Sequence, residues 1–221
     1  MSEDAFIVSP TRKHTGTIIF LHGLGENGEN WKLVLSKMVK PNVKVICLNA
    51  KKIPLTLNKG FPTAAWFDLA SLDENKLEDE TSIMRAVENL HDIIDEEIAS
   101  SKVSATKTML AGFSQGGALA MYAALTYHKR LAAVMVMSSW PVLRHTMPEV
   151  STAAINNTNT PMLQCHGTED PVIYYKWGLI LADALKEMNP KHEFKSYEGL
   201  KHAVNDQELQ DVKTFINKIF P

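Results

Sequence analysis

The chain has little of what marks a secreted, membrane-spanning or nucleic-acid-binding protein. Its 221 residues include only two cysteines, Cys47 and Cys165, and both lie in apolar runs where buried, reduced thiols are expected. No apolar run is long enough to span a bilayer, and the acidic N-terminal stretch lacks the basic and apolar regions of a signal peptide. With 23 basic and 25 acidic residues, it lacks the basic excess that nucleic-acid binding requires. These absences predict a cytoplasmic protein with no transmembrane segment and no nucleic-acid partner.

Internal repeats, low-complexity tracts and long linkers are absent as well, so we expect one domain spanning residues 1–221. The spacings that bind metal ions, such as H-E-x-x-H or paired C-x-x-C, are also missing. The sequence therefore predicts neither a metal ion nor another cofactor.

What the sequence does contain is an alternation of short apolar runs with longer amphipathic stretches. The apolar runs are continuous, which is typical of parallel strands buried on both faces. An apolar stripe with spacings of three and four runs from Ile83 to Ile98, and Asn205 with Glu208 has the spacing of a helix N-cap and its return partner. This alternation predicts a three-layer α/β fold, in which a mostly parallel central sheet is flanked by helices. The expected strands are 15–23, 43–50, 106–112, 131–139, 161–167 and 192–199.

Two long segments, at about residues 51–80 and 140–160, fit neither pattern. Both are weakly periodic, carry aromatic residues and follow predicted strands. Long loops in a compact domain are usually functional, and α/β proteins bind ligands at the carboxyl edge of the sheet. We therefore expect these segments to border a binding site.

The stretch Gly112-Phe113-Ser114-Gln115-Gly116 matches the pattern G-x-S-x-G. It lies between a predicted strand and a predicted helix, the context in which a sharp turn exposes a nucleophilic serine. The alternative is that Ser114 is an ordinary helix N-cap and that the glycines serve packing.

A serine nucleophile needs a base and an acid that orients the base, and in this topology both follow it along the chain. Asp170 and His202 each come directly after a predicted strand, so they should reach the same edge as Ser114. Glu169 and Asp206 are rival acids, and Asp170 before Pro171 is also a common turn signal. Of the other histidines, His22 and His166 precede glycines and suit structural hydrogen bonding, whereas five are expected to be solvated: His14, His91, His128, His145 and His192.

The oxyanion of an acyl transfer needs backbone donors as well. Gln115 follows the nucleophile, and Leu24 lies between Gly23 and Gly25 in a loop after an early strand, so their N–H groups are the expected pair. The alternative is a glycine-rich turn that binds no ligand.

The stretches FLHGLGENGENW, WFD, GFSQGGALAMYAAL, QCHGTEDPV and YEGLKHAVNDQELQDVKTFI, in this order, resemble the acyl-protein thioesterase/lysophospholipase family of small α/β-hydrolases. The resemblance runs from Phe20 to Ile216. It implies an α/β-hydrolase fold, a triad of Ser114, Asp170 and His202, and oxyanion donors at Leu24 and Gln115. It also implies hydrolysis of palmitoyl thioesters on proteins, of lysophospholipids and of small esters, and it is compatible with peripheral membrane contact.

The chain departs from the family pattern near the expected acyl channel. AKKIPLTLN replaces a proline-rich segment that usually carries an arginine, SSW replaces SCW, and AVN follows the base in place of small polar residues. The acyl-chain preference therefore stays open, as do two other readings: a general carboxylesterase for small soluble esters, and a ligand-binding fold without catalysis. The residues expected to contact substrate are Leu24, Leu55, Leu57, Phe61, Trp66, Leu69, Leu72, Trp140 and Val172.

Overall fold

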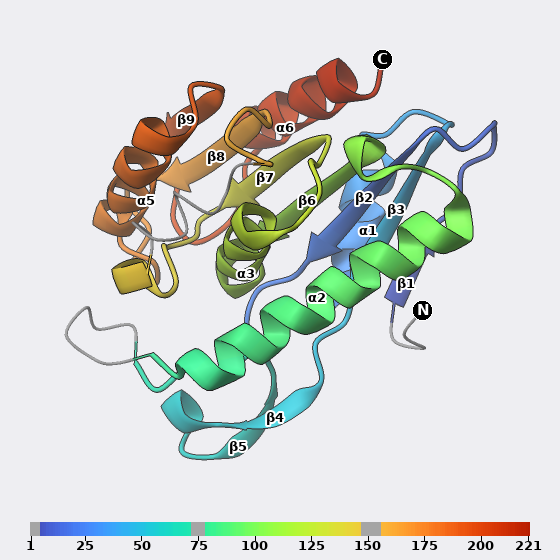
Figure 1. The fold of residues 1–221 in the computed structure, drawn as a ribbon. Coiled ribbons are helices and arrows are strands. Elements are labelled where there is room, and N and C mark those ends of the chain that lie inside the picture. The colour runs from blue at the N-terminus through green and yellow to red at the C-terminus, as the bar shows by residue number, and fades with distance from the viewer. Residues whose placement is uncertain (1–4, 72–77, 147–155) are drawn as a thin grey trace.

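The computed structural model describes residues 5–71, 78–146 and 156–221, and their central element is a mostly parallel sheet (Figure 1). Seven strands pair in the order β1-β3-β2-β6-β7-β8-β9, and all pairs are parallel except β1 with β3. All six predicted strands are present, and the predicted fold class is confirmed. The strands are β1 (Ala5–Val8), β2 (Gly16–Leu21), β3 (Val43–Leu48), β6 (Thr108–Phe113), β7 (Ala133–Met137), β8 (Met162–Gly167) and β9 (His192–Tyr197).

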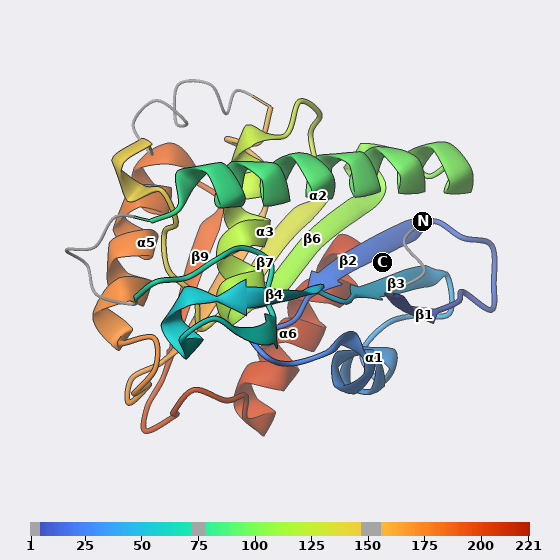
Figure 2. The same cartoon turned by 90° about the horizontal axis from the view of Figure 1, so that it is seen from below.

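Helices cover both faces of this sheet (Figure 2). Alternate residues of β2 show why: Ile19 and Leu21 pack into a core with α2, α3 and α5, whereas Ile18 and Phe20 pack into a second core with α1 and α6. Every residue of β2, β6, β7 and β8 is buried, which explains their continuous apolar runs. The helices are α1 (Gly28–Ser36), α2 (Glu80–Ser101), α3 (Ser114–Thr126), α5 (Tyr175–Met188) and α6 (Asp206–Ile219), with a short 3-10 turn, η2 (Ala105–Lys107), before β6.

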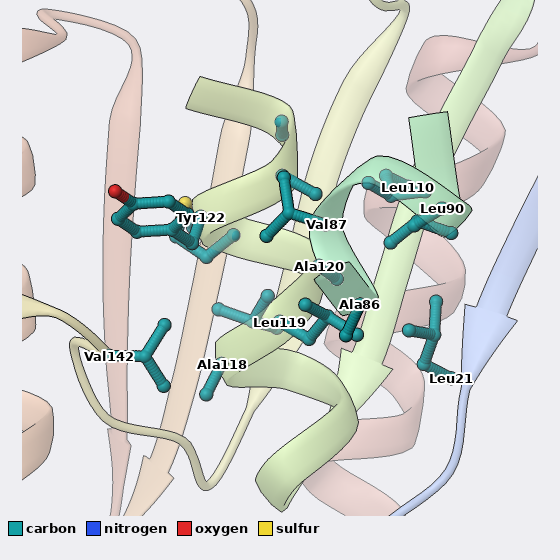
Figure 3. Packing of buried hydrophobic residues seen from close by; sticks show 14 of the residues in the cluster. Leu21, Ala86, Val87, Leu90, Leu110, Ala118, Leu119, Ala120, Tyr122 and Val142 are labelled. Atoms are coloured by element: carbon teal, nitrogen blue, oxygen red, sulfur yellow. The ribbon is translucent and has the colours of Figure 1, made fainter. Parts of the chain in front are cut away.

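The predicted apolar stripe of α2 faces the sheet. Ile83, Val87, Leu90 and Ile94 are buried, and Figure 3 shows Val87 and Leu90 among side chains of α3, β2 and β6. No helix in the described part of the chain is long and apolar enough to cross a membrane.

The start of α6 confirms one prediction and corrects another. Asn205 is the N-cap, because its side chain accepts a hydrogen bond from the backbone N–H of Glu208. The expected return contact is wrong: the Glu208 side chain is fully buried, and neither carboxylate oxygen has a hydrogen-bond partner among the described residues. Packing of α6 against the sheet turns this side chain inward, away from the cap.

The described parts of the two long segments contain more regular structure than a loop prediction implies. Residues 51–80 contain a separate antiparallel hairpin of β4 (Lys52–Leu55) and β5 (Phe61–Ala64), joined through the 3-10 turn η1 (Thr56–Asn58). Residues 140–160 include a third 3-10 turn, η3 (Arg144–Thr146). The hairpin lies beside the start of α2 (Figures 1 and 2).

Candidate active site

Ser114 lies at the sharp turn between β6 and α3. Its backbone is left-handed, with φ of 53°, which is a strained conformation for a residue other than glycine. The glycines make this turn possible, because a Cβ on Gly116 would lie 2.3 Å from the carbonyl oxygen of Leu21, and one on Gly112 would lie 2.5 Å from the backbone of Gly116. The serine hydroxyl therefore stands at the carboxyl edge of the sheet, at the N-terminus of α3.

Two residues that follow later strands, His202 and Asp170, form a continuous chain of hydrogen bonds with this hydroxyl. His202, beyond the end of β9, has Nε2 at 3.0 Å from Ser114 Oγ and Nδ1 at 2.7 Å from Asp170 Oδ2. Asp170 follows β8, so all three side chains meet at one edge, as their positions after strands predict. The chain can move a proton from the serine to the histidine while the carboxylate fixes the tautomer of the ring.

The surroundings of Asp170 favour its ionised form. Its Oδ1 accepts hydrogen bonds from the backbone N–H groups of Val172, at 2.9 Å, and Ile173, at 2.8 Å. Burial alone would raise the pKa of this carboxyl, but hydrogen bonds and the charge of His202, together with these amides, lower the pKa below its usual value. The rival acids Glu169 and Asp206 are exposed, and no hydrogen bond among the described residues joins either to His202.

Two buried histidines support the loops of the site, as predicted. His22 Nδ1 lies 2.7 Å from the carbonyl oxygen of Gly23, and its Nε2 accepts from the N–H of Ala50 at 3.0 Å. His166 Nε2 donates to the carbonyl oxygen of Ile173 at 2.8 Å and lies 3.7 Å from Asp170 Oδ2. Burial lowers the pKa of both rings, so they serve as neutral hydrogen-bonding groups.

The prediction that five other histidines are solvated is only partly right. His128 and His145 are exposed, but three are half-buried and hydrogen-bonded, namely His14, His91 and His192. The partners of His91 and His192 come from distant parts of the chain, so the sequence does not reveal them, whereas His14 bonds locally to Gly16 and Thr17.

The two residues predicted to supply oxyanion donors, Leu24 and Gln115, line the same cleft as Ser114. Gln115 occupies the first turn of α3, whose N–H groups have no partner within the helix. Its buried side chain accepts from the N–H of Trp66 at 3.1 Å and donates to the carbonyl oxygen of Phe67 at 2.9 Å, which ties the helix start to the segment after β5. Leu24 lies in a loop held by hydrogen bonds from Gly23 N–H to Glu26 and from Gly25 N–H to Ala64.

A cleft of about 160 Å³ opens at Ser114. Four of the residues expected to contact substrate line it, namely Leu24, Leu69, Trp140 and Val172. The rest of its described lining is Gly23, Glu26, Phe113, Ser114, Gln115, Ile173 and His202. The volume is below the range of roughly 300–1,000 Å³ that is usual for ligand pockets, so the described part of the cleft encloses only a small group.

The other predicted substrate contacts lie elsewhere. Leu57 and Phe61 are exposed on the hairpin, Leu55 at the end of β4 is buried, and Trp66 is half-buried, with its indole N–H donating to the carbonyl oxygen of His22. Leu72 lies outside the described residues. The predicted apolar trough included Leu57 and Phe61, but the side chains of Leu57, in η1, and Phe61, in β5, are exposed to solvent.

Sequence reasoning also missed Phe113 in the lining. Its ring centroid lies 4.9 Å from that of His202, and Trp31 packs on its other side at 5.4 Å. The available signal was its position directly before the serine in G-x-S-x-G.

Both cysteines are buried and free, as predicted. Within the described residues, no group of three or more His, Cys, Asp or Glu side chains could hold a metal ion.

Comparisons of the sequence with family models and with known proteins all indicate the same protein family. A family model described as phospholipase/carboxylesterase matches residues 2–220. Acyl-protein thioesterase 1 of Neurospora crassa is 33% identical over 224 residues, covering 97% of this chain and 91% of the relative. Acyl-protein thioesterase 1 of Cryptococcus neoformans is 34% identical, covering 95% of this chain and 94% of the relative.

Solved structures are similar over the same extent. The crystal structure of Zea mays acyl-protein thioesterase 2 superposes with a TM-score of 0.86 at 31% identity, covering 98% of this chain and 99% of that one. Arabidopsis thaliana SOBER1 superposes with a TM-score of 0.84 at 31% identity, covering 94% of this chain and 100% of that one.

Proposed function

Because the chain belongs to the phospholipase/carboxylesterase family and is a hydrolase, we propose that it cleaves acyl thioesters through an acyl-enzyme on Ser114. The substrate class is S-palmitoyl-cysteine on proteins, with related lysophospholipid and carboxylic esters accepted by the same chemistry. The observation that carries the proposal is the hydrogen-bonded chain from Ser114 Oγ through His202 to Asp170, with distances of 3.0 and 2.7 Å. The names of the Neurospora and Cryptococcus relatives support the thioester and the acylated protein.

The proposed reaction uses side chains and amides of the site, together with one water molecule. His202 Nε2 takes the proton of Ser114 as Oγ attacks the acyl carbon, and the carbonyl electron pair moves onto oxygen. The N–H groups of Leu24 and Gln115 receive this oxyanion. As the carbonyl re-forms, His202 returns the proton to the departing thiolate or alkoxide, which leaves an ester on Ser114. A water molecule, deprotonated by His202, then attacks the ester carbon, and His202 returns that proton to Ser114 Oγ as the bond to the fatty acid breaks. Asp170 stays ionised throughout and stabilises the imidazolium.

A general carboxylesterase for small soluble esters is the second candidate, and the modest volume of the cleft favours it. A thioester and an oxygen ester pass through tetrahedral intermediates of the same geometry, so the triad does not distinguish them.

The proposal also includes contact with a membrane surface, where acylated proteins lie, and the exposed side chains of Leu57 and Phe61 on the hairpin support it. The proposal includes a cytoplasmic location, which the two buried, free cysteines support.

The test combines an active-site probe with a substrate series. A fluorophosphonate should label the wild-type protein and not Ser114→Ala, and the variant should lose about 10⁶-fold in kcat if the three side chains act as a unit. Ser36→Ala, an exposed serine on α1, is the matched control and should keep full labelling. A folded wild-type protein without labelling would mean a binding protein instead of an enzyme. Faster turnover of acetyl esters than of palmitoyl thioesters would favour the carboxylesterase.

A further inference from the structure

The loop after β7, residues 138–143, is buried and held in a strained conformation. Ser138 and Leu143 both have left-handed backbones, with φ of 49° each, although neither is glycine. The hydroxyl groups of Ser138 and Ser139 are buried without a hydrogen-bond partner among the described residues. Strained backbone of this kind persists only where surrounding contacts hold it. The loop carries Trp140, which is 8% exposed and forms part of the cleft wall beside Ser114.

One side chain from a distant segment holds this loop. Glu78, just before α2, accepts a hydrogen bond of 2.6 Å from the backbone N–H of Leu143, 65 positions later in the chain. The Trp140 side chain lies near the same carboxylate and favours its ionised form. The bond to Leu143 has a charged acceptor that is half-buried, the setting in which hydrogen bonds are strongest. Burial raises the pKa of Glu78, while the Leu143 N–H, the Trp140 side chain and the nearby charge of His145 oppose that effect.

Trp140 separates two spaces. On one side it lines the cleft at Ser114, and on the other it borders a small apolar hollow formed by α3, α5 and the loop itself. Ala118, Tyr122 and Val142 line this hollow and lie near one another in Figure 3. The orientation of the indole therefore decides where the wall of the cleft stands. Glu78 is not part of the described lining, so it can act on a substrate only through this loop.

We propose that Glu78 is a positioning residue that sets the acyl-chain preference of the site by fixing Trp140 in the cleft wall. This inference rests on the proposed hydrolase function at Ser114. The carbonyl carbon of the substrate lies at Ser114, whereas the distal chain must run along the wall. Loss of Glu78 therefore weakens contacts with long chains and leaves the reacting end of short chains unaffected.

The experiment compares Glu78→Ala with the wild type on thioesters graded from acetyl to palmitoyl. Removal of the charge-assisted hydrogen bond to Leu143 should lower kcat/KM for long chains roughly tenfold, mainly through KM, with acetyl thioester turnover changed by less than about twofold. Glu78→Gln keeps the side-chain shape and an acceptor oxygen, so it should restore much of the preference. Glu80→Ala is the matched control, because Glu80 is exposed and lies 3.6 Å from His145. It should leave the profile unchanged.

The outcomes separate this inference from the proposed function. If the wild type hydrolyses no ester, the proposed function fails; if it hydrolyses them and Glu78→Ala loses short and long chains equally or neither, only the role of Glu78 is overturned. If Glu78→Ala does not fold, Glu78→Asp decides, because its shorter side chain keeps the charge but withdraws the carboxylate from the Leu143 N–H. An unchanged chain-length profile for Glu78→Asp would overturn the proposal, and a selective loss of long-chain turnover would support it.

Discussion

Glu208 should make the protein less stable as the pH rises through neutrality, and Glu208→Gln should remove this dependence. The carboxyl group is fully buried in the first turn of α6, and neither of its oxygens has a hydrogen-bond partner among the described residues. Burial, with a smaller contribution from the charge of Asp211, raises its pKa from 4.5 to about 8. At neutral pH the folded protein therefore holds a proton at Glu208 that the unfolded chain has released.

The sign and size of the effect follow from this difference. Between the two pKa values the folded state binds more protons than the unfolded state, so the free energy of unfolding falls by about 1.4 kcal/mol for each pH unit. The stabilising contribution is complete below about pH 4.5 and is lost by about pH 8. At pH 7 the loss amounts to about 3 kcal/mol, a large share of the roughly 5–15 kcal/mol that stabilises most domains.

Urea unfolding of the wild type and of Glu208→Gln, at several pH values between about 5 and about 8, measures this pH-dependent contribution to stability. The glutamine amide brings N–H donors into the same apolar surroundings, which shifts the variant by an amount that does not vary with pH. The diagnostic quantity is therefore the difference between the two free energies of unfolding, which should change steadily in favour of the variant as the pH rises. Glu187→Gln, an exposed acid on α5, should run parallel to the wild type. Parallel curves for Glu208→Gln as well would refute the assignment of a buried, protonated carboxyl.

Two further predictions concern the serine turn. Gln115→Ala keeps the backbone N–H but loses the side-chain hydrogen bonds to Trp66 and Phe67, each worth about 1 kcal/mol, so the melting temperature should fall by about 4–8 °C in a thermal scan. Gly116→Ala places a methyl group 2.3 Å from the carbonyl oxygen of Leu21 and should cost about 3 kcal/mol in urea unfolding, with loss of probe labelling; a stable, fully labelled variant would contradict the close packing.

The sequence was sufficient for six of the seven strands of the central sheet and for the three residues that meet at Ser114, because both depend on strong, local signals. It missed β1, the short antiparallel edge strand. Buried parallel strands produce continuous apolar runs, and residues that follow such strands reach one edge. The hairpin of β4 and β5 has no comparable signal, since its short strands are largely exposed and are held by pairing with each other. Leu57 and Phe61 could therefore not be placed.

Contacts between distant segments were also beyond reach of the sequence. Glu78 and Leu143 match no motif, and their hydrogen bond becomes visible only when the two long segments are seen together. For Glu208, the sequence predicted a local contact that does not form. Its spacing from Asn205 favours a capping hydrogen bond, but packing of α6 against the sheet buries the Glu208 side chain instead.

The hydrogen-bonded chain at Ser114 also has a consequence for the order of folding. Its hydrogen bonds span 88 residues from Ser114 to His202 and 32 residues from Asp170 to His202, and His202 lies beyond the last strand of the sheet. Pairings between distant parts of a chain form late, because loop closure must precede them. A nascent or refolding chain can therefore bury most of its core before His202 reaches Ser114. In the proposed mechanism, the gain of reactivity at Ser114 then reports the docking of β9 on β8, and not the collapse of the core.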